Sequence, residues 1–172
     1  METITLRNET PSDHRIVENL TREAFWNQYA PGCSEHYLLR VVRDADAFIR
    51  ELDVVAEVDG KIVGNIVYTK AKIVCDNGEC HEVISFGPVS VLPEFQGKGI
   101  GGRLIEHTKT LAQTMGCRAI LIYGDPDLYC KFGFVQAEEY GIGTPDNMYA
   151  AALQAFELYP AALAGCKGRF YE

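Results

Sequence analysis

A seven-residue stretch rich in glycine has the composition of an anion-binding turn. It runs Gln96, Gly97, Lys98, Gly99, Ile100, Gly101, Gly102, between a β-branched segment and a segment with helical periodicity. A helix N-terminus presents N–H groups without a partner in the helix, and its macrodipole adds partial positive charge. Glycines let the backbone approach an oxygen-rich anion because no Cβ stands in the way. The stretch therefore predicts a pyrophosphate-binding turn, with a flexible turn and close helix packing as the alternative.

The charge around this turn supports an anion. The segment from Gln96 to Arg118 carries only Glu106 as an acid, and its basic residues are Lys98, Arg103, Lys109 and Arg118. The whole chain has a net charge of −8. An acidic chain is a poor general binder of nucleic acid or anionic membranes, whose affinity rests on Lys and Arg. We therefore expect one compact anion site, no nucleic acid and no membrane partner.

Two other glycine motifs fit the turn less well. Gly97, Gly99 and Gly102 have the spacing of the dinucleotide fingerprint, with Asp125 as the downstream acid. However, residues 92–96 separate the turn from its strand, and too little chain follows Asp125 for a doubly wound sheet. The phosphate-binding loop of nucleotide hydrolases is excluded because Lys98 is not followed by Ser or Thr. A nucleotide-binding module is therefore the weakest of the functional hypotheses that the sequence supports.

The six cysteines and the polar N-terminus indicate a reducing compartment. The first ten residues contain no apolar h-region, no apolar run reaches the roughly 20 residues of a membrane span, and several cysteines stand inside apolar runs. Cytoplasmic free thiols are therefore expected. Cys75, Cys80 and His81 form the only metal-like spacing, and because a second ligand pair is missing, the sequence predicts no metal.

The N-terminal part predicts one strand and two helices. Residues 3–7 alternate as a strand does, and Thr10 to Asp13 provide an N-cap, a proline and an acid for a first helix. A second helix is expected over residues 34–43. The expected buried face of the first helix consists of Ile16, Val17, Leu20, Ala24 and Phe25.

The middle of the chain predicts an antiparallel meander followed by a parallel crossover. Asp59-Gly60 and Asn77-Gly78 are hairpin signals between the apolar runs at 52–58, 61–74 and 81–91. A helix follows Gly99 and ends at Gly116, and residues 118–123 form a short apolar strand. The expected buried face of that helix consists of Ile100, Leu104, Thr108, Leu111, Ala112 and Met115.

This order of elements predicts a single α+β domain over residues 1–172. Its central sheet is mixed but mostly antiparallel, with a β-α-β crossover and flanking helices. Residues 151–159 are expected to be helical by propensity, although the positions of the polar residues Gln154 and Glu157 do not distinguish a helical from a strand period.

The motifs together resemble the GNAT superfamily of N-acetyltransferases. Its signature, Gln or Arg, two residues, Gly, one residue, then Gly or Ala, matches Gln96 to Gly101 within PVSVLPEFQGKGIGGRLI. A second signature, a Tyr followed by Gly-Phe, matches Tyr129 with Gly133 and Phe134. The resemblance covers about residues 52–136. The segments GDPDLYCKFGF and ELYPAALAGCKGRFYE are similar to the YhbS-like branch of the superfamily.

The resemblance implies a GNAT-like fold, acetyl-CoA as cosubstrate without a metal, and transfer of the acetyl group to an amine, either a small molecule or a peptide. It implies that Tyr129 donates a proton to the leaving thiolate, by direct transfer rather than through an acetylated Cys130. The residues that it assigns to acetyl-CoA are Val89, Ser90 and Val91 for pantetheine and Gln96, Gly97, Lys98, Gly99, Ile100, Gly101 and Gly102 for the pyrophosphate.

Three features stay undetermined by the sequence. The base that deprotonates the amine has candidates in His81, Glu82 and Ser85, none of which matches the family's glutamate. The acceptor amine is not specified, and neither is the oligomeric state, although family members are often homodimers. The runner-up function is a catalytically silent CoA-binding sensor or interaction module, which retains the fold without turnover.

Overall fold

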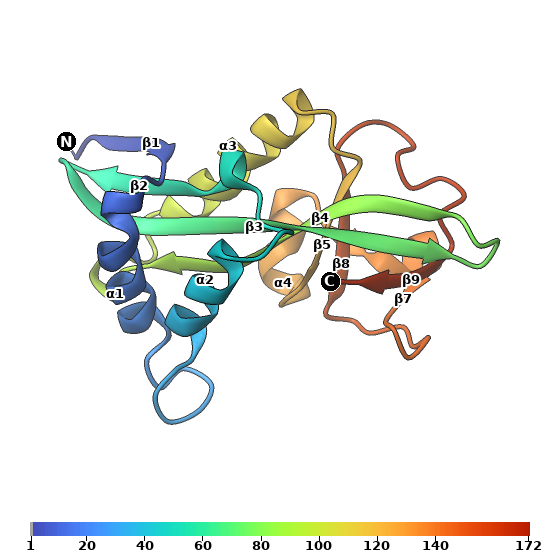
Figure 1. Ribbon diagram of the computed structural model, residues 1–172, viewed down its shortest axis with the longest axis horizontal. Helices are drawn as coiled ribbons and strands as arrows, with labels where there is room; N and C mark the ends of the chain where they lie inside the picture. Colours follow the sequence, from blue (N-terminus) through green and yellow to red (C-terminus); the bar gives the residue numbers. More distant parts are fainter. Residues whose placement is uncertain (1) are drawn as a thin grey trace. The chain divides into compact units, whose positions relative to one another are not determined.

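The structure, a computed structural model, describes residues 2–172, and the chain divides into two compact units. Unit 1 contains residues 2–68 and 87–108, and unit 2 contains residues 69–86 and 109–172. The helices are α1 (His14–Phe25), α2 (Glu35–Arg43), α3 (Ile100–Thr114) and α4 (Pro126–Tyr129) (Figure 1). The strands are β1 (Ile4–Asn8), β2 (Val54–Val58), β3 (Lys61–Cys75), β4 (Cys80–Val91), β5 (Ala119–Tyr123), β6 (Val135–Gln136), β7 (Ile142–Gly143), β8 (Leu153–Glu157) and β9 (Gly168–Tyr171).

Unit 1 is built on the antiparallel meander that the hairpin signals predict. Strand β1 pairs antiparallel with β2, and β2 pairs antiparallel with β3. Asp59 and Gly60 both have positive φ, 49° and 84°, as expected for the two central residues of a tight hairpin. The strands expected at residues 3–7 and 52–58 are thus confirmed within one or two residues.

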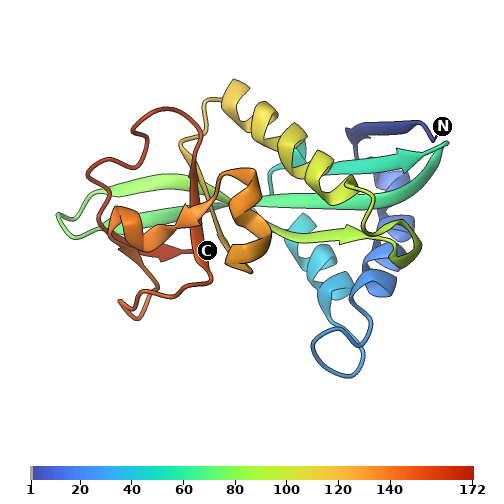
Figure 2. The same cartoon turned by 180° about the vertical axis from the view of Figure 1, so that it is seen from behind.

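Helices cover both faces of the unit 1 strands. Figures 1 and 2 show opposite sides of the molecule, with α1 and α2 in front of β3 in one view and the start of α3 in front in the other. The capping box at Thr10 and Asp13 closes a short 3₁₀ turn, and α1 follows it. The expected apolar face of α1 is partly wrong, because Ile16 is 51% exposed while Thr21 is buried.

Unit 2 contains the parallel crossover. Strand β4 pairs in parallel with β5 at Ile84 and Ile120, and helix α3 connects the two strands. Strand β5 pairs antiparallel with β8, and β8 pairs antiparallel with β6. The end of β3 pairs antiparallel with β9. This mixed sheet with flanking helices confirms the α+β fold class.

Two local expectations need correction. Residues 153–157 form strand β8 rather than a helix, because the open side of β5 supplies a ladder in which Ile120 lies opposite Phe156. Tertiary pairing here overrides helix propensity, which is a weak prior. In α3, Thr108 and Ala112 are buried as expected, but Met115 lies beyond the last helical residue and is exposed.

Among residues 2–172, every helix is either too short or too polar to cross a lipid bilayer.

Candidate functional site

The glycine turn lies in unit 1, between the end of β4 and the start of α3. A short 3₁₀ turn, Pro93–Phe95, leads into it. Gly97 and Gly99 have φ values of 76° and 82°, and a Cβ at either position would meet nothing within 4 Å. Backbone conformation, not space, therefore requires glycine at these two positions. At Gly97 and Gly99 no side chain covers the backbone on its solvent-exposed side.

The N–H groups of the turn are open to a ligand. Within residues 2–172, no main-chain N–H from Gly97 to Gly102 donates a hydrogen bond, and the first bond of the helix runs from Arg103 N–H to the Gly99 carbonyl at 3.0 Å. Gly97, Lys98 and Gly99 are exposed. An anion near such a helix end gains about 0.3–1 kcal/mol, and up to about 2 kcal/mol when it is partly buried. The turn thus has the geometry of a phosphate cradle.

The side chain of Gln96 stabilises the turn itself. Its Nε2 donates a hydrogen bond to the Val91 carbonyl at 2.9 Å, which fastens the turn to the last residue of β4. The Gln96 N–H also donates to the Pro93 carbonyl, at 3.3 Å, so the side chain and the N–H of Gln96 both hold the turn.

Strand β4 presents the three residues predicted for pantetheine next to this turn. Ser90 is buried at 1% exposure, and its Oγ bonds Thr21 Oγ1 on α1 at 3.1 Å. Its side chain is therefore engaged inside unit 1. Val89 and Val91 are half-buried and alternate with it along the strand. Because the Ser90 side chain is engaged, a ligand at this strand would meet main-chain groups and the two valines.

Sequence reasoning missed Gly64 as a positioning residue. A Cβ at Gly64 would lie 3.2 Å from the Ser90 carbonyl oxygen, 3.2 Å from Leu104 Cδ1 and 3.3 Å from Ile100 Cγ2. The missing side chain lets β3 and the first turn of α3 approach closely, which fixes the helix start. A glycine inside a strand pattern is the signal that marks such a position.

The expected positive field is smaller than the sequence indicates. Lys98 and Arg103 remain exposed at the turn, and Lys98 makes a surface ion pair with Glu2 at 3.8 Å and lies 5.1 Å from the centroid of the Phe95 ring. Lys109 and Arg118 instead donate to main-chain carbonyls within unit 2, Phe132 O at 2.6 Å and Ala162 O at 2.8 Å. Two of the basic residues therefore serve as structural donors.

Tyr129 lies in unit 2, at the end of α4, where the sequence predicts it. Asp125 caps the helix by accepting a hydrogen bond from Asp127 N–H at 2.9 Å, and Pro126 occupies the first helical position. The N–H of Tyr129 donates to the Asp125 carbonyl at 3.1 Å. Asp125 and Pro126 therefore have a structural role, because they set the start of the helix that carries Tyr129.

The ring of Tyr129 is held in an aromatic cluster. Its centroid lies 5.9 Å from that of Phe86, 6.0 Å from Phe134 and 6.5 Å from Phe132. Gly124 makes room for the ring, since a Cβ there would stand 2.4 Å from Tyr129 Cε2. The orientation of the phenol is therefore set by its neighbours as well as by its helix.

Two buried polar side chains whose contacts the sequence did not indicate support this cluster. Gln154, only 1% exposed, donates to the Gly124 carbonyl at 2.9 Å, and the Gly124 N–H donates to the Ala152 carbonyl at 2.9 Å. Lys109 Nζ lies 3.9 Å from the centroid of the Phe156 ring as well as bonding Phe132 O. These contacts could be found only from the fold, because β8 and α3 are distant from α4 in the chain.

The three base candidates lie on the unit 2 part of β4 in different environments. Ser85 is buried and Glu82 is exposed. His81 Nε2 lies 3.4 Å from Glu79 Oε2, and the ring also lies beside two cysteines. None of these observations selects a base.

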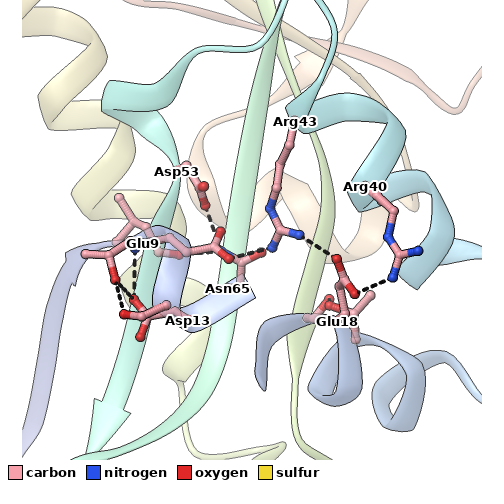
Figure 3. Close-up of polar contacts among 12 residues, drawn as sticks. Glu9, Asp13, Glu18, Arg40, Arg43, Asp53 and Asn65 are labelled. Carbon is pink, nitrogen blue, oxygen red and sulfur yellow. Dashed lines mark hydrogen bonds and ion pairs between the residues drawn. The ribbon is translucent and has the colours of Figure 1, made fainter. Parts of the chain in front are cut away.

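A second polar cluster, buried in unit 1, joins β1, α1, α2 and β3 (Figure 3). Arg43 donates to Glu9 Oε1 at 2.5 Å and to Glu18 Oε1 at 3.0 Å. Asn65 Nδ2 donates to Asp53 Oδ1 at 3.0 Å. Burial raises the pKa of Glu9 from 4.5 to about 9, and its hydrogen bond with Asp53 acts in the same direction. Glu9 therefore keeps its proton to a higher pH than an exposed glutamate does.

The comparison with protein families agrees with this geometry. A family model described as an acetyltransferase (GNAT) domain matches residues 50–136, about half of the chain. The matched segment contains the glycine turn and Tyr129. The chain belongs to the GNAT acetyltransferase family.

Two relatives in Escherichia coli are similar in sequence to this chain. An uncharacterized N-acetyltransferase, YjhQ of Escherichia coli, is 35% identical over 85 residues, which cover 48% of this chain and 45% of that protein. Another, YhbS of Escherichia coli, is 24% identical over 163 residues, which cover 95% of this chain and 92% of that protein. The YhbS-like resemblance is thus confirmed, and transferase activity is supported at the level of the family.

Solved structures confirm the fold. The crystal structure of Escherichia coli YhbS in complex with CoA matches with a TM-score of 0.86 at 23% identity, covering 100% of this chain and 91% of that one. A GNAT family acetyltransferase from Brucella melitensis in complex with acetyl-CoA matches with a TM-score of 0.78 at 27% identity, covering 100% and 97%.

Proposed function

We propose that this protein is an acetyl-CoA-dependent N-acetyltransferase that passes the acetyl group directly to an amine in a ternary complex. The observation that carries the proposal is the row of N–H groups from Gly97 to Gly102 that has no partner within residues 2–172. A 15-residue helix stands behind these groups, so its dipole reinforces them. The CoA and acetyl-CoA complexes of the two structural relatives support the same ligand class.

Two parts of the cosubstrate, the pyrophosphate and pantetheine, have proposed contacts. The pyrophosphate binds the main-chain N–H groups from Gly97 to Gly102, with Lys98 as an added charge, and Gln96 holds the turn through its bond to the Val91 carbonyl. Pantetheine pairs with the main chain of Val89, Ser90 and Val91.

The chemistry needs one proton donor and one proton acceptor. The lone pair of the amine attacks the thioester carbonyl carbon, and the tetrahedral adduct then expels the CoA thiolate as the C–S bond breaks. Tyr129 gives its phenolic proton to that sulfur, and a base or a water chain removes the proton that the attacking nitrogen loses. The amide and CoA are the products, and the proton from nitrogen balances the one that Tyr129 gave.

The acceptor is proposed to bind near the N-terminal helices or the C-terminal segment. Three aromatic side chains close to α1 and α2 are exposed rather than in the core, namely Trp26, Tyr29 and Tyr37. Tyr149 and Tyr159 are exposed in the C-terminal part. Large exposed apolar side chains on both segments suit contacts with a ligand or a partner.

The first experiment is calorimetric titration with acetyl-CoA, followed by a screen of amines monitored by release of free CoA thiol. Saturable binding and amine-dependent thiol release are expected. Absence of CoA binding at millimolar ligand would refute the proposal, whereas tight binding without turnover on any amine would favour the sensor.

The second experiment replaces Tyr129 by Phe on an amine found in that screen. We expect kcat to fall about 100-fold, within the roughly 10²–10⁴ typical of general acid catalysis, with acetyl-CoA affinity unchanged. Tyr171→Phe, a half-buried tyrosine of β9, serves as the control and should retain kcat. Equal rates for the parent and Tyr129→Phe would remove the proposed acid.

A further inference from the structure

Two cysteines and a histidine from separate segments of unit 2 meet in one cluster. Cys75 ends β3, His81 lies at the start of β4, and Cys166 precedes β9. One potential ligand atom from each of the three lies within 4.8 Å of the other two. Ligand atoms on one tetrahedral zinc ion stand roughly 3.8 Å apart, given Zn–S of about 2.3 Å, so small side-chain rotations suffice to close the site.

The burial of the cluster suits coordination of a cation that prefers sulfur. Cys75 is 4% exposed and Cys166 is 1% exposed, and both belong to the apolar core of unit 2. His81 is half-buried and forms the solvent side of the cluster. A cation bound there would have two sulfurs and one imidazole as protein ligands and one open position toward solvent.

Main-chain hydrogen bonds fix the segments that carry the three ligands. The Cys75 N–H donates to the Glu79 carbonyl at 2.8 Å, which closes the hairpin between Cys75 and His81. The Asp76 N–H donates to the Lys167 carbonyl at 2.9 Å, next to Cys166. A Cβ at Gly168 would lie 2.2 Å from the Val74 carbonyl oxygen, so glycine alone permits this approach. The site is therefore preorganised by the backbone.

A carboxylate lies beside the histidine. Glu79 Oε2 is 3.4 Å from His81 Nε2. Metal-bound histidines commonly donate their other ring N–H to such a carboxylate, which fixes the ring orientation and raises its basicity as a ligand. Glu79 can take this place when the cation binds the Nδ1 atom of His81.

We propose that Cys75, His81 and Cys166 form a site for a thiophilic divalent cation, with Zn²⁺ as the expected ion. Two thiolates and an imidazole form a donor set that suits zinc, while magnesium and calcium prefer oxygen ligands. Binding replaces the protons of the two thiols, which pass to solvent. The ion would link the hairpin between β3 and β4 to the C-terminal strand β9.

The sequence spacing points to the wrong second cysteine. Cys80, the neighbour of His81, is exposed and lies outside the cluster, whereas Cys166 enters it from a distant part of the chain. Cys80 is therefore a matched control.

The test uses the full chain, reduced and treated with a chelator, and titrated without oxygen with Co²⁺ and then Zn²⁺. One equivalent of Co²⁺ should give a thiolate-to-cobalt charge-transfer band in the near ultraviolet and intense visible d–d bands, and Zn²⁺ should displace it. Cys80→Ser should behave as the parent does. Cys166→Ser and His81→Ala should weaken binding by more than about tenfold, the lower range found for outer-shell partners.

A second measurement distinguishes loss of the cation site from misfolding of a variant. Zn²⁺ should raise the melting temperature of the parent and of Cys80→Ser but not that of His81→Ala, which removes a half-buried ring and retains both sulfurs. The proposal is overturned if the parent shows no charge-transfer band, if Cys166→Ser binds as the parent does, or if Cys80→Ser loses the ion.

Discussion

At the scale of single residues, the phenol of Tyr129 depends on groups that do no chemistry themselves. Gly124 gives the ring its space, and Gln154 holds the Gly124 carbonyl from a buried position. A catalytic side chain must be kept close to its productive geometry by neighbours of this kind. Gly124 and Gln154 are thus positioning residues for the proposed acid.

Gly124→Ala tests this arrangement. The new methyl would stand 2.4 Å from Tyr129 Cε2, so the ring must move. We expect kcat to fall at least about tenfold, because displacements near 1 Å can cost about 10²-fold, while acetyl-CoA affinity is retained.

A double mutant separates positioning from general damage. In the Tyr129→Phe background the acid is already absent, so Gly124→Ala should reduce kcat much less than it does in the parent. If Gly124→Ala reduced kcat by the same factor in the parent and in Tyr129→Phe, the positioning role would be contradicted.

At the scale of elements, the turn between β4 and α3 owes its shape to two residues with positive φ. Gly97 and Gly99 need the left-handed region, and open space surrounds both. The same is true of Gly78, in the hairpin between β3 and β4, where φ is 89°. Gly78 therefore provides a control for the energetic cost of placing a Cβ at a residue with positive φ.

Replacement of Gly97 or Gly99 by Ala should weaken acetyl-CoA binding about tenfold. A Cβ disfavours the left-handed conformation by roughly 1–2 kcal/mol, so the turn relaxes and its N–H groups lose alignment. Gly78→Ala carries a similar penalty and should leave the dissociation constant, measured by calorimetry, unchanged. A comparable loss of affinity in Gly78→Ala would argue against a specific role of the turn.

Gly64 in β3 gives a second prediction at this scale. Gly64→Val should lower the free energy of unfolding by about 1–3 kcal/mol, because the added carbons meet Leu104 and Ile100 in a filled core. Gly64→Ala should cost less. Urea denaturation measures both, and an Ala variant less stable than the Val variant would rule out crowding as the cause.

At the scale of the whole molecule, stability depends on how the buried charges of Figure 3 titrate. Glu9 has no solvent exposure at its side chain, and its Oε2 accepts no hydrogen bond within residues 2–172. A carboxylate oxygen buried without a donor favours the protonated form of Glu9. Burial and Asp53 raise the pKa of Glu9 in the folded state, so the folded chain holds a proton that the unfolded chain releases.

The free energy of unfolding should therefore contain a contribution from Glu9 that is complete below about pH 4.5 and is lost as the pH rises toward 9. Glu9→Gln keeps a donor toward Asp53 and cannot ionise, so its stability should fall less over this range. Urea denaturation at pH 5, 7 and 9 measures the difference between the two proteins. Parallel pH profiles would show that Glu9 does not titrate in this window.

The opposite trend is expected from Asp13. The guanidinium of Arg7, which contacts it at 2.7 Å, holds the pKa of Asp13 well below its usual range. Its contribution is present above about pH 4 and is lost in acid. Because the contributions of Asp13 and Glu9 change with pH in opposite directions, the pH dependence of one protein mixes the two. The difference in the free energy of unfolding between the parent and Glu9→Gln isolates the contribution of Glu9.

The parts of the site that depend on neighbours in the chain could be predicted from the sequence. The turn at residues 96–102, the cap that Asp125 and Pro126 give to α4, and the crossover from β4 to β5 are all encoded in short stretches. The bonds of the turn and the cap join residues a few positions apart, and the crossover follows from the order of strand, helix and strand along the chain, so residue type and spacing suffice to indicate all three. The two family signatures belong to the same class of local pattern.

Only the tertiary structure decided the contacts between distant segments. Strand β8 exists because β5 offers it a ladder, Gln154 thereby reaches Gly124, and Cys166 joins Cys75 because β9 pairs with the end of β3. Such contacts depend on which surfaces pack together, and no local pattern specifies that. The sequence by itself determined the family and its chemical motifs, and the packing determined what holds and surrounds them.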